Sequence, residues 1–144
     1  VEKALAECNS ARGPRVITGG HTIEGSRSAI EQELRREDRA TAVLAATNVA
    51  TLGAIKAIQA LQLDMPRDIS LVGFDDFEWM TALRPFVSAF SQPTARLAAE
   101  AWDILLRQLT PGFDRTRQRD LAKITLAGEF RIRESSGRAP ASGA

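Results

Sequence analysis

A chain of 144 residues is long enough for one domain with a hydrophobic core, and its composition is that of a globular protein. Its net charge of +1 gives no strong field toward nucleic acid, and its apolar runs are far shorter than the roughly 20 residues of a membrane span. The only cysteine, Cys8, leaves no disulfide within the chain and fits a reducing, cytoplasmic compartment.

Strands and helices alternate in the first half of the chain. Gly19 and Gly20 end the first strand, and Thr22 and Asn48 are residue types that cap a helix, because their side chains accept from open backbone N–H groups. The expected elements are a helix end over 1–8, a strand over 15–18, a helix from 23 to about 36, a strand over 41–46 and a helix over 48–61.

The segment ISLVGFDD, over residues 69–76, is the most informative stretch. Its unbroken run of apolar strand formers predicts a strand buried on both faces, as in a parallel sheet covered by helices. Asp75 and Asp76 follow at the carboxyl end of this strand, which is the end where open α/β sheets bind ligands. Any ligand site is therefore expected near these two carboxylates.

The second half continues with fewer helices. Pro93 is suited to begin a helix, because its missing N–H needs no partner there. The expected elements are a helical piece over 77–83, strands over 87–91, 123–127 and 129–132, a helix over 93–109, and a small polar, disordered tail over 135–144. Together the elements predict an α/β fold with a parallel sheet flanked by helices.

Three segments taken in order carry a family resemblance. AVLAATNVATLGAIKAIQA (42–60), MPRDISLVGFDD (65–76) and FVSAFSQP (86–93) resemble the LacI/GalR family of transcriptional regulators, and EFRIRESS (129–136) resembles the last strand of that family's core. The similarity covers roughly residues 15–135. It is to the two-lobed, type I periplasmic-binding-protein-like core, and not to the DNA-binding head.

The resemblance implies a division of the chain. Residues 1–134 would form a partial effector-binding core, in which 1–92 and 110–134 belong to the C-terminal lobe and the helix over 93–109 belongs to the N-terminal lobe. Family members bind a small effector, usually a sugar or a related metabolite, between the lobes. We therefore expect half of a pocket in this chain, with weak or no effector affinity in isolation.

Four residues are implied as effector contacts, and three of them also have a plainer interpretation. Asp75 would accept hydrogen bonds from effector donors, or serve as a turn residue, whereas Asp76 is expected to be the cap or turn. His21 would stack on the ligand or lie exposed in a loop. Thr47 stands where the family commonly has asparagine and offers a shorter reach, and Trp79 would wall the pocket or pack against the strand edge.

Leu52 and Leu83 correspond to positions of the family's dimer interface, although Leu52 also fits the core stripe of its helix. A homodimer is expected, because an operator with two-fold symmetry needs two heads.

No nucleophile, phosphate-loop or metal-ligand pattern is present, so we expect no enzyme, no cofactor and no metal. The leading hypothesis is the effector-sensing, dimerising part of a regulator, with operator DNA bound by a separate head. The alternative is a solute-binding protein of a sugar transporter with the same core fold.

Overall fold

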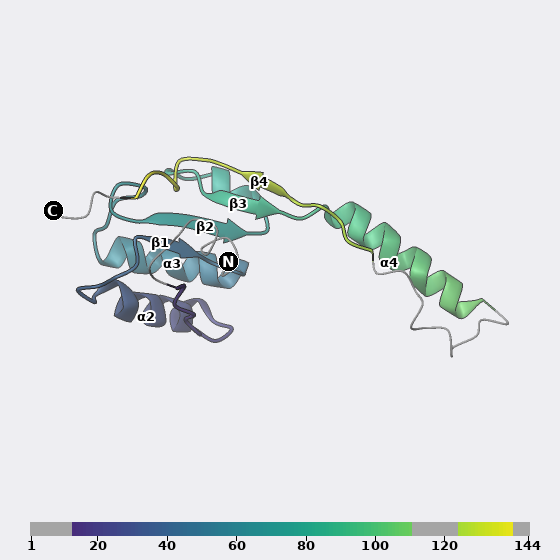
Figure 1. The fold of residues 1–144 in the computed structure, drawn as a ribbon, viewed down its shortest axis with the longest axis horizontal. Coiled ribbons are helices and arrows are strands. Elements are labelled where there is room, and N and C mark those ends of the chain that lie inside the picture. Colours follow the sequence, from purple (N-terminus) through teal and green to yellow (C-terminus); the bar gives the residue numbers. More distant parts are fainter. Residues whose placement is uncertain (1–12, 111–123, 140–144) are drawn as a thin grey trace.

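The computed structural model describes residues 13–110 and 124–139. Its centre is one mixed sheet with the strand order β1-β2-β3-β4 (Figure 1). The first three strands are parallel and the fourth runs antiparallel to β3. The strands are β1 (Ala42–Leu44), β2 (Ser70–Phe74), β3 (Ser88–Ser91) and β4 (Glu129–Arg131). The predicted α/β fold is confirmed, with one correction: the last strand makes the sheet mixed.

Helices lie in layers beneath this sheet. In Figure 1 α3 lies against the sheet and α2 lies on the far side of α3. The helical elements are α2 (Ile23–Leu34), α3 (Asn48–Ala60), the short 3₁₀ helix η1 (Glu78–Thr81) and α4 (Thr94–Leu109). No described helix is both long enough and apolar enough to cross a membrane.

The two helix caps had different outcomes. Thr22 caps α2 as expected, since its side chain accepts from the backbone N–H of Gly25 at 3.0 Å. Asn48 does not cap α3: the cap is Thr47, whose hydroxyl accepts from Ala50 N at 3.1 Å. The reason is conformational, because Thr47 keeps an extended backbone while Asn48 is already the first helical residue.

Small residues dominate the buried face of α3. The sequence pattern predicts a core stripe of Leu52, Ile55, Ile58 and Leu61, but of these only Ile58 is fully buried. The other buried positions are Thr51, Gly53, Ala54 and Ala57. A Cβ on Gly53 would lie 2.5 Å from the Ser26 Cβ of α2. The helix is enclosed between the sheet and α2, and this close crossing leaves no room for larger side chains.

The two faces of β2 have different surroundings. Ile69, Leu71 and Gly73 point toward α3, and the first two are completely buried. On the other face Phe74 stacks on Phe90 with ring centroids 5.5 Å apart, but both rings are only half-buried. Burial of the strand on both faces is therefore not what the described residues show.

Two expected strands are absent from the structure. Residues 15–18 pair with no strand, and Val16 is 89% exposed. Residues 124–127 belong to no strand, so in the described part of that region only β4 forms. The expected helix over 1–8 and residues 111–123 lie outside the described residues.

The predicted disordered tail is wrong at its start. Ser135 is completely buried, donates to Leu71 O at 2.6 Å and accepts from Ser88 N at 2.8 Å. Gly137 N donates to Ser70 Oγ at 3.1 Å. These bonds fasten the chain after β4 to the two inner strands, β2 and β3. Within the predicted tail, residues 140–144 lie outside the described part.

Helix α4 stands apart from this body. It begins directly after Pro93, as predicted, and Figure 1 shows it projecting beyond the ends of β2 and β3. None of its residues is buried, and its apolar side includes Leu97, Trp102 and Leu105, which are 41%, 59% and 43% exposed. This apolar side has no cover among the described residues.

Candidate functional site

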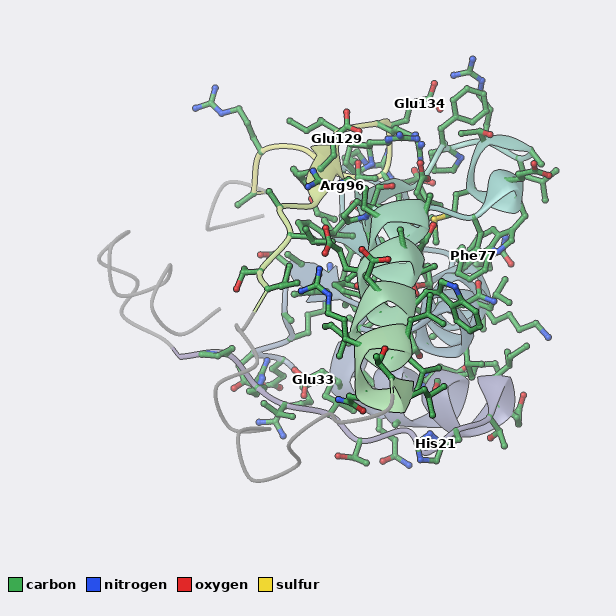
Figure 2. All side chains as sticks on the ribbon, turned by 90° about the vertical axis from the view of Figure 1, so that its right-hand side faces the viewer. His21, Glu33, Phe77, Arg96, Glu129 and Glu134 are labelled. Atoms are coloured by element: carbon green, nitrogen blue, oxygen red, sulfur yellow. The ribbon has the colours of Figure 1, made fainter. Side chains whose placement is uncertain are left out.

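The carboxyl ends of β1 and β2 bring two candidate residues to one edge of the sheet. Leu44 pairs with Val72 in the parallel register. Thr47 and Asp75 each follow three residues beyond that pair, so they leave neighbouring strands at the same level. Figure 2 looks onto this end of the molecule, with α4 toward the viewer.

Asp75 has an unusual backbone conformation. Its φ of 64° lies in the left-handed region, which costs a non-glycine residue about 1 kcal/mol or more, although aspartate tolerates it better than most. Asp75 N donates to Phe90 O at 3.0 Å, and Asp75 O accepts from Phe77 N at 3.2 Å. The backbone is therefore held from both sides while the chain turns sharply out of β2.

The carboxylate of Asp75 has one neighbour within the sheet edge. Gln92 Nε2 donates to Asp75 Oδ1 at 2.6 Å. No other hydrogen bond to this carboxylate is found among residues 13–110 and 124–139, and the side chain is half-buried. Oδ2 is thus an acceptor at the edge where ligands bind in open α/β sheets.

Asp76 has a different role from the expected cap or turn. Its carboxylate, 7% exposed, accepts from Arg133 at 2.6 and 2.8 Å and from Arg131 at 2.6 Å. The hydrogen bond from Arg133 is the main cause of a lowered pKa of Asp76, and the bond from Arg131 acts in the same direction. Asp76 is therefore the centre of a buried ion cluster that joins β2 to the last strand.

The two arginines of this cluster were missed at the sequence level. Arg133 also donates to Val87 O at 2.7 Å, and its backbone N–H donates to Ser88 Oγ at 2.8 Å. The available signal was the alternation in EFRIRESS, which places Arg131 and Arg133 on one side of an extended chain. Gln92 was also missed as a partner of Asp75.

Trp79 lies next to the end of β1. Its Nε1 donates to Asn48 Oδ1 at 3.0 Å, and its half-buried ring packs against the hydrophobic core. Asn48, the residue after the cap Thr47, therefore holds the indole in place. The Thr47 hydroxyl oxygen accepts from Ala50 N, so its O–H remains available as a donor.

His21 lies at the level of α2 and is exposed (Figure 2). The preceding turn is close to the helix, because a Cβ on Gly25 would lie 2.4 Å from Gly19 O. No hydrogen bond in the described part of the chain joins His21 to Asp75, Thr47 or Trp79. The structure thus groups three of the four candidates at the ends of β1 and β2 and leaves His21 one layer away.

The two leucines of the expected dimer contact differ in exposure. Leu52 is half-buried on α3, whereas Leu83 is 79% exposed after η1.

An open hollow between residues 16–18 and α2, lined in part by Glu33 and Arg36, contains none of the candidate effector residues. Within residues 13–110 and 124–139 no three His, Cys, Asp or Glu side chains gather closely enough to hold a metal.

The chemistry of the edge suits binding. It offers a carboxylate oxygen as acceptor, a threonine O–H as donor and an indole beside them. Hydroxyl or N–H groups of a small polar ligand would complement such a set.

Known proteins match this chain along most of its length. The profile of the periplasmic binding protein-like domain family covers residues 2–136. The ribose operon repressor of Haemophilus influenzae is 35% identical over 109 residues, which are 75% of this chain and 33% of the repressor. The transcriptional repressor PurR of the same species is 30% identical over 135 residues, which are 93% of this chain and 40% of that protein.

Solved structures agree on the fold. A putative transcription regulator from Staphylococcus saprophyticus has a TM-score of 0.76 at 24% identity, covering 92% of this chain and 48% of that one. A LacI family regulator from Arthrobacter sp. FB24 in complex with lactose has a TM-score of 0.72 at 23% identity, covering 94% and 49%. A LacI family regulator from Enterococcus faecium with bound ribose has a TM-score of 0.73 at 19% identity, covering 96% and 49%.

The chain thus spans a third to two fifths of the two sequence relatives and about half of the solved structures. The two sequence relatives are named as repressors. The sheet has the fold of the LacI family structures named above, and the matched profile places the chain in the periplasmic binding protein-like domain family.

Proposed function

We propose that this chain is the effector-contacting half of a LacI/GalR-type regulator core, and that a small hydroxyl-bearing metabolite, most simply a sugar, binds at the ends of β1 and β2. The observation that carries the proposal is Asp75. Its strained backbone, at φ 64°, turns the chain out of β2, and one carboxylate oxygen has no partner among the described residues. Strain of this kind concentrates at ligand sites, where it presents a side chain.

Thr47 and Trp79 complete the proposed half-site. Thr47 stands at the same level as Asp75 on the neighbouring strand, and Trp79 is fixed beside it through Asn48. A donor hydroxyl, an acceptor carboxylate and an aromatic side chain form a common set for sugar recognition. His21 belongs to the proposal only as a contact that a further movement of its loop would bring into reach.

The proposal divides the chain as the family resemblance implied. Residues 1–92 and 110–134 would belong to one lobe, and α4 would pack its apolar side on the other lobe. A ligand enclosed by two lobes loses most of its contacts when one lobe is absent. We therefore expect only weak affinity, on the order of millimolar, for this chain alone.

The regulator is favoured over a solute-binding protein by its relatives. The ribose operon repressor and PurR are both transcriptional repressors, and they match three quarters or more of the chain. Operator DNA would be contacted by a separate head, in the cytoplasm, and two-fold operators would require a dimer. Leu83, exposed after η1, and Leu52 are the proposed dimer contacts.

The binding proposal is tested by nuclear magnetic resonance titration of the ¹⁵N-labelled chain with D-ribose, D-glucose and lactose, separately. We expect shifts concentrated at Thr47, Asp75 and Trp79 for at least one sugar, and their loss in Asp75→Ala. Asp64→Ala removes a carboxylate remote from the sheet edge and serves as control. Shifts that persist in Asp75→Ala, micromolar binding to this chain, or no response to any of the three sugars would contradict the proposal.

The dimer proposal has its own test. Leu83→Asp places a charge on a side chain that is 79% exposed, so it leaves the fold intact while opposing burial in an interface. Sedimentation equilibrium should show a weakened dimer relative to the unmodified chain, with Leu109→Asp, also exposed at 70%, as the control on another surface. An unmodified chain that sediments as a monomer at high concentration would argue against this interface.

A further inference from the structure

We infer that Gln92 is a positioning residue that ties the proposed effector carboxylate, Asp75, to the start of α4, so that ligand occupancy at Asp75 and the direction of α4 are coupled. The inference rests on the proposed function for its ligand and on the structure for its mechanical part. It concerns three residues that lie at the junction of the sheet and the projecting helix: Asp75, Gln92 and Thr94.

The side chain of Gln92 is held in one orientation. An ionised carboxylate only accepts hydrogen bonds, so the amide must present Nε2 to Asp75 Oδ1, which lies 2.6 Å away. Gln92 Oε1 therefore points away from Asp75. Both groups are half-buried, and a short charge-assisted bond links the carboxylate to the amide.

Gln92 lies two residues before the start of α4. Gln92 O accepts from Thr94 N, the first residue of the helix, at 2.9 Å. Pro93 intervenes with a restricted φ, here −78°, so few torsions separate the amide side chain from the helix axis. A rotation of the Gln92 backbone is thus transmitted to the direction of α4.

Among the described residues, little else holds α4 in place. None of its sixteen residues is buried, and the helix projects beyond the sheet in Figure 1. The chain leaves β3 through residues 91–93 and returns toward β4 through residues 124–128, where a Cβ on Gly128 would lie 2.3 Å from the Phe90 ring. The direction of α4 is therefore set where the chain leaves the sheet and where it returns to it. At the first of these two places, the Gln92 side chain bonds to Asp75.

The consequence for a ligand follows from the shared carboxylate. A ligand hydroxyl or N–H group that donates to Asp75 either rotates the carboxylate or competes with Gln92 Nε2 for its oxygen. Either change alters the tie to α4, and by linkage a change in α4 alters the affinity at Asp75. The expected ligand is a small polyhydroxylated molecule with adjacent donors, since Asp75 Oδ2 and Gln92 Oε1 are both acceptors.

The tie is tested without any ligand by electron paramagnetic resonance distance measurement. Nitroxides are placed at Lys56→Cys on α3 and Asp103→Cys on α4, both exposed, in a background with Cys8→Ser. Gln92→Leu and Asp75→Ala should each broaden the distance distribution, and the double variant should broaden it no further. Asp75→Asn keeps an acceptor oxygen and should stay close to the parent.

Gln59→Leu, the same chemical change at an exposed position of α3, is the matched control. The inference is overturned if Gln92→Leu leaves the distribution unchanged, if the effects of Gln92→Leu and Asp75→Ala add fully, or if Gln59→Leu has the same effect. Circular dichroism on each variant separates a changed helix direction from a loss of folding.

The coupling is tested by adding D-ribose to the spin-labelled chain. We expect a shifted distribution in the parent and a smaller shift in Gln92→Leu. Ribose binding seen at Asp75 by nuclear magnetic resonance without any change in distance would overturn the coupling. Absence of ribose, glucose and lactose binding would instead contradict the proposed function, while the ligand-free series would still decide whether Gln92 is the tie.

Discussion

The ion cluster around Asp76 allows a quantitative prediction for Asp76→Asn. The substitution keeps the shape of the side chain but removes its charge and one of its acceptor oxygens. Arg133, 17% exposed, loses a two-point pair, and Arg131, 46% exposed, loses a single contact. Breaking a buried ion pair costs about 3–5 kcal/mol, and breaking an exposed one costs at most about 1 kcal/mol. Because the asparagine keeps one acceptor oxygen, we expect the free energy of unfolding to fall by about 2–3 kcal/mol at pH 7.

The same cluster predicts how stability depends on pH. Arg133 and Arg131 hold the pKa of Asp76 below its ordinary value, whereas in the unfolded chain an aspartate titrates near about 4. The stabilisation is therefore complete above about pH 4 and is lost as the pH falls through the lower pKa of the folded state. Asp76→Asn lacks this titration, so the difference between the variant and the parent should shrink in that acidic range.

Urea unfolding followed by circular dichroism, at pH 7 and stepwise down to about pH 3, measures both effects. Glu129→Gln is the matched control, because the Glu129 side chain is 69% exposed and its carboxylate bonds only to Arg131, at 3.2 and 3.3 Å, within the described residues. The control should change the free energy of unfolding by less than about 1 kcal/mol. The reasoning would be refuted by an Asp76→Asn variant as stable as the parent at pH 7, or by a difference that stays constant down to about pH 3.

Three further substitutions test the packing around the site by urea unfolding. Ser135→Ala leaves Leu71 O and Ser88 N without their buried hydrogen-bond partner and should lower the free energy of unfolding by about 2–4 kcal/mol. Ser28→Ala, at an exposed position, is the control and should change it little. Equal effects of the two substitutions would contradict the role of Ser135 in fastening the chain. Gly53→Ala should destabilise by about 1–3 kcal/mol despite the better helix propensity of alanine, because its Cβ meets Ser26, whereas Gly13→Ala has open space and should be neutral. Thr47→Ala removes the cap of α3 and should cost about 1 kcal/mol, with Thr47→Ser close to the parent; a neutral Thr47→Ala would show that the cap contributes little.

Features that depend on near neighbours in sequence were largely predictable. The presence of a strand at β2, the Thr22 cap and the helix that begins after Pro93 all follow from residues close together in the sequence, although burial of β2 on both faces was not confirmed. Asn48 was misassigned for a similarly local reason. Asparagine and threonine are both good caps, and only the backbone conformation decides which of the two adjacent residues lies outside the helix.

Features that depend on distant partners were not predictable in the same way. Ser135 looks like part of a small polar tail, yet it is buried because Leu71 and Ser88, more than 40 residues away, supply its hydrogen bonds. The strand expected over 15–18 fails for the opposite reason. Strand-forming residues are present there, but no neighbouring strand pairs with them, and β propensity alone does not make a strand.

Asp75 and Asp76 show how far sequence reasoning reaches at the site itself. The two residues are identical and adjacent, so composition and spacing cannot separate their roles. Two structural facts separate them: the left-handed turn at Asp75, and the arginines of the last strand, 55 and 57 residues away, that surround Asp76. The charge of Asp76 is neutralised inside the protein, whereas Asp75 shares one oxygen with Gln92 and keeps the other available. The two adjacent carboxylates therefore differ in what they can do: Asp76 is held in an ion cluster within the protein, whereas Asp75 offers an acceptor oxygen that has no partner among the described residues.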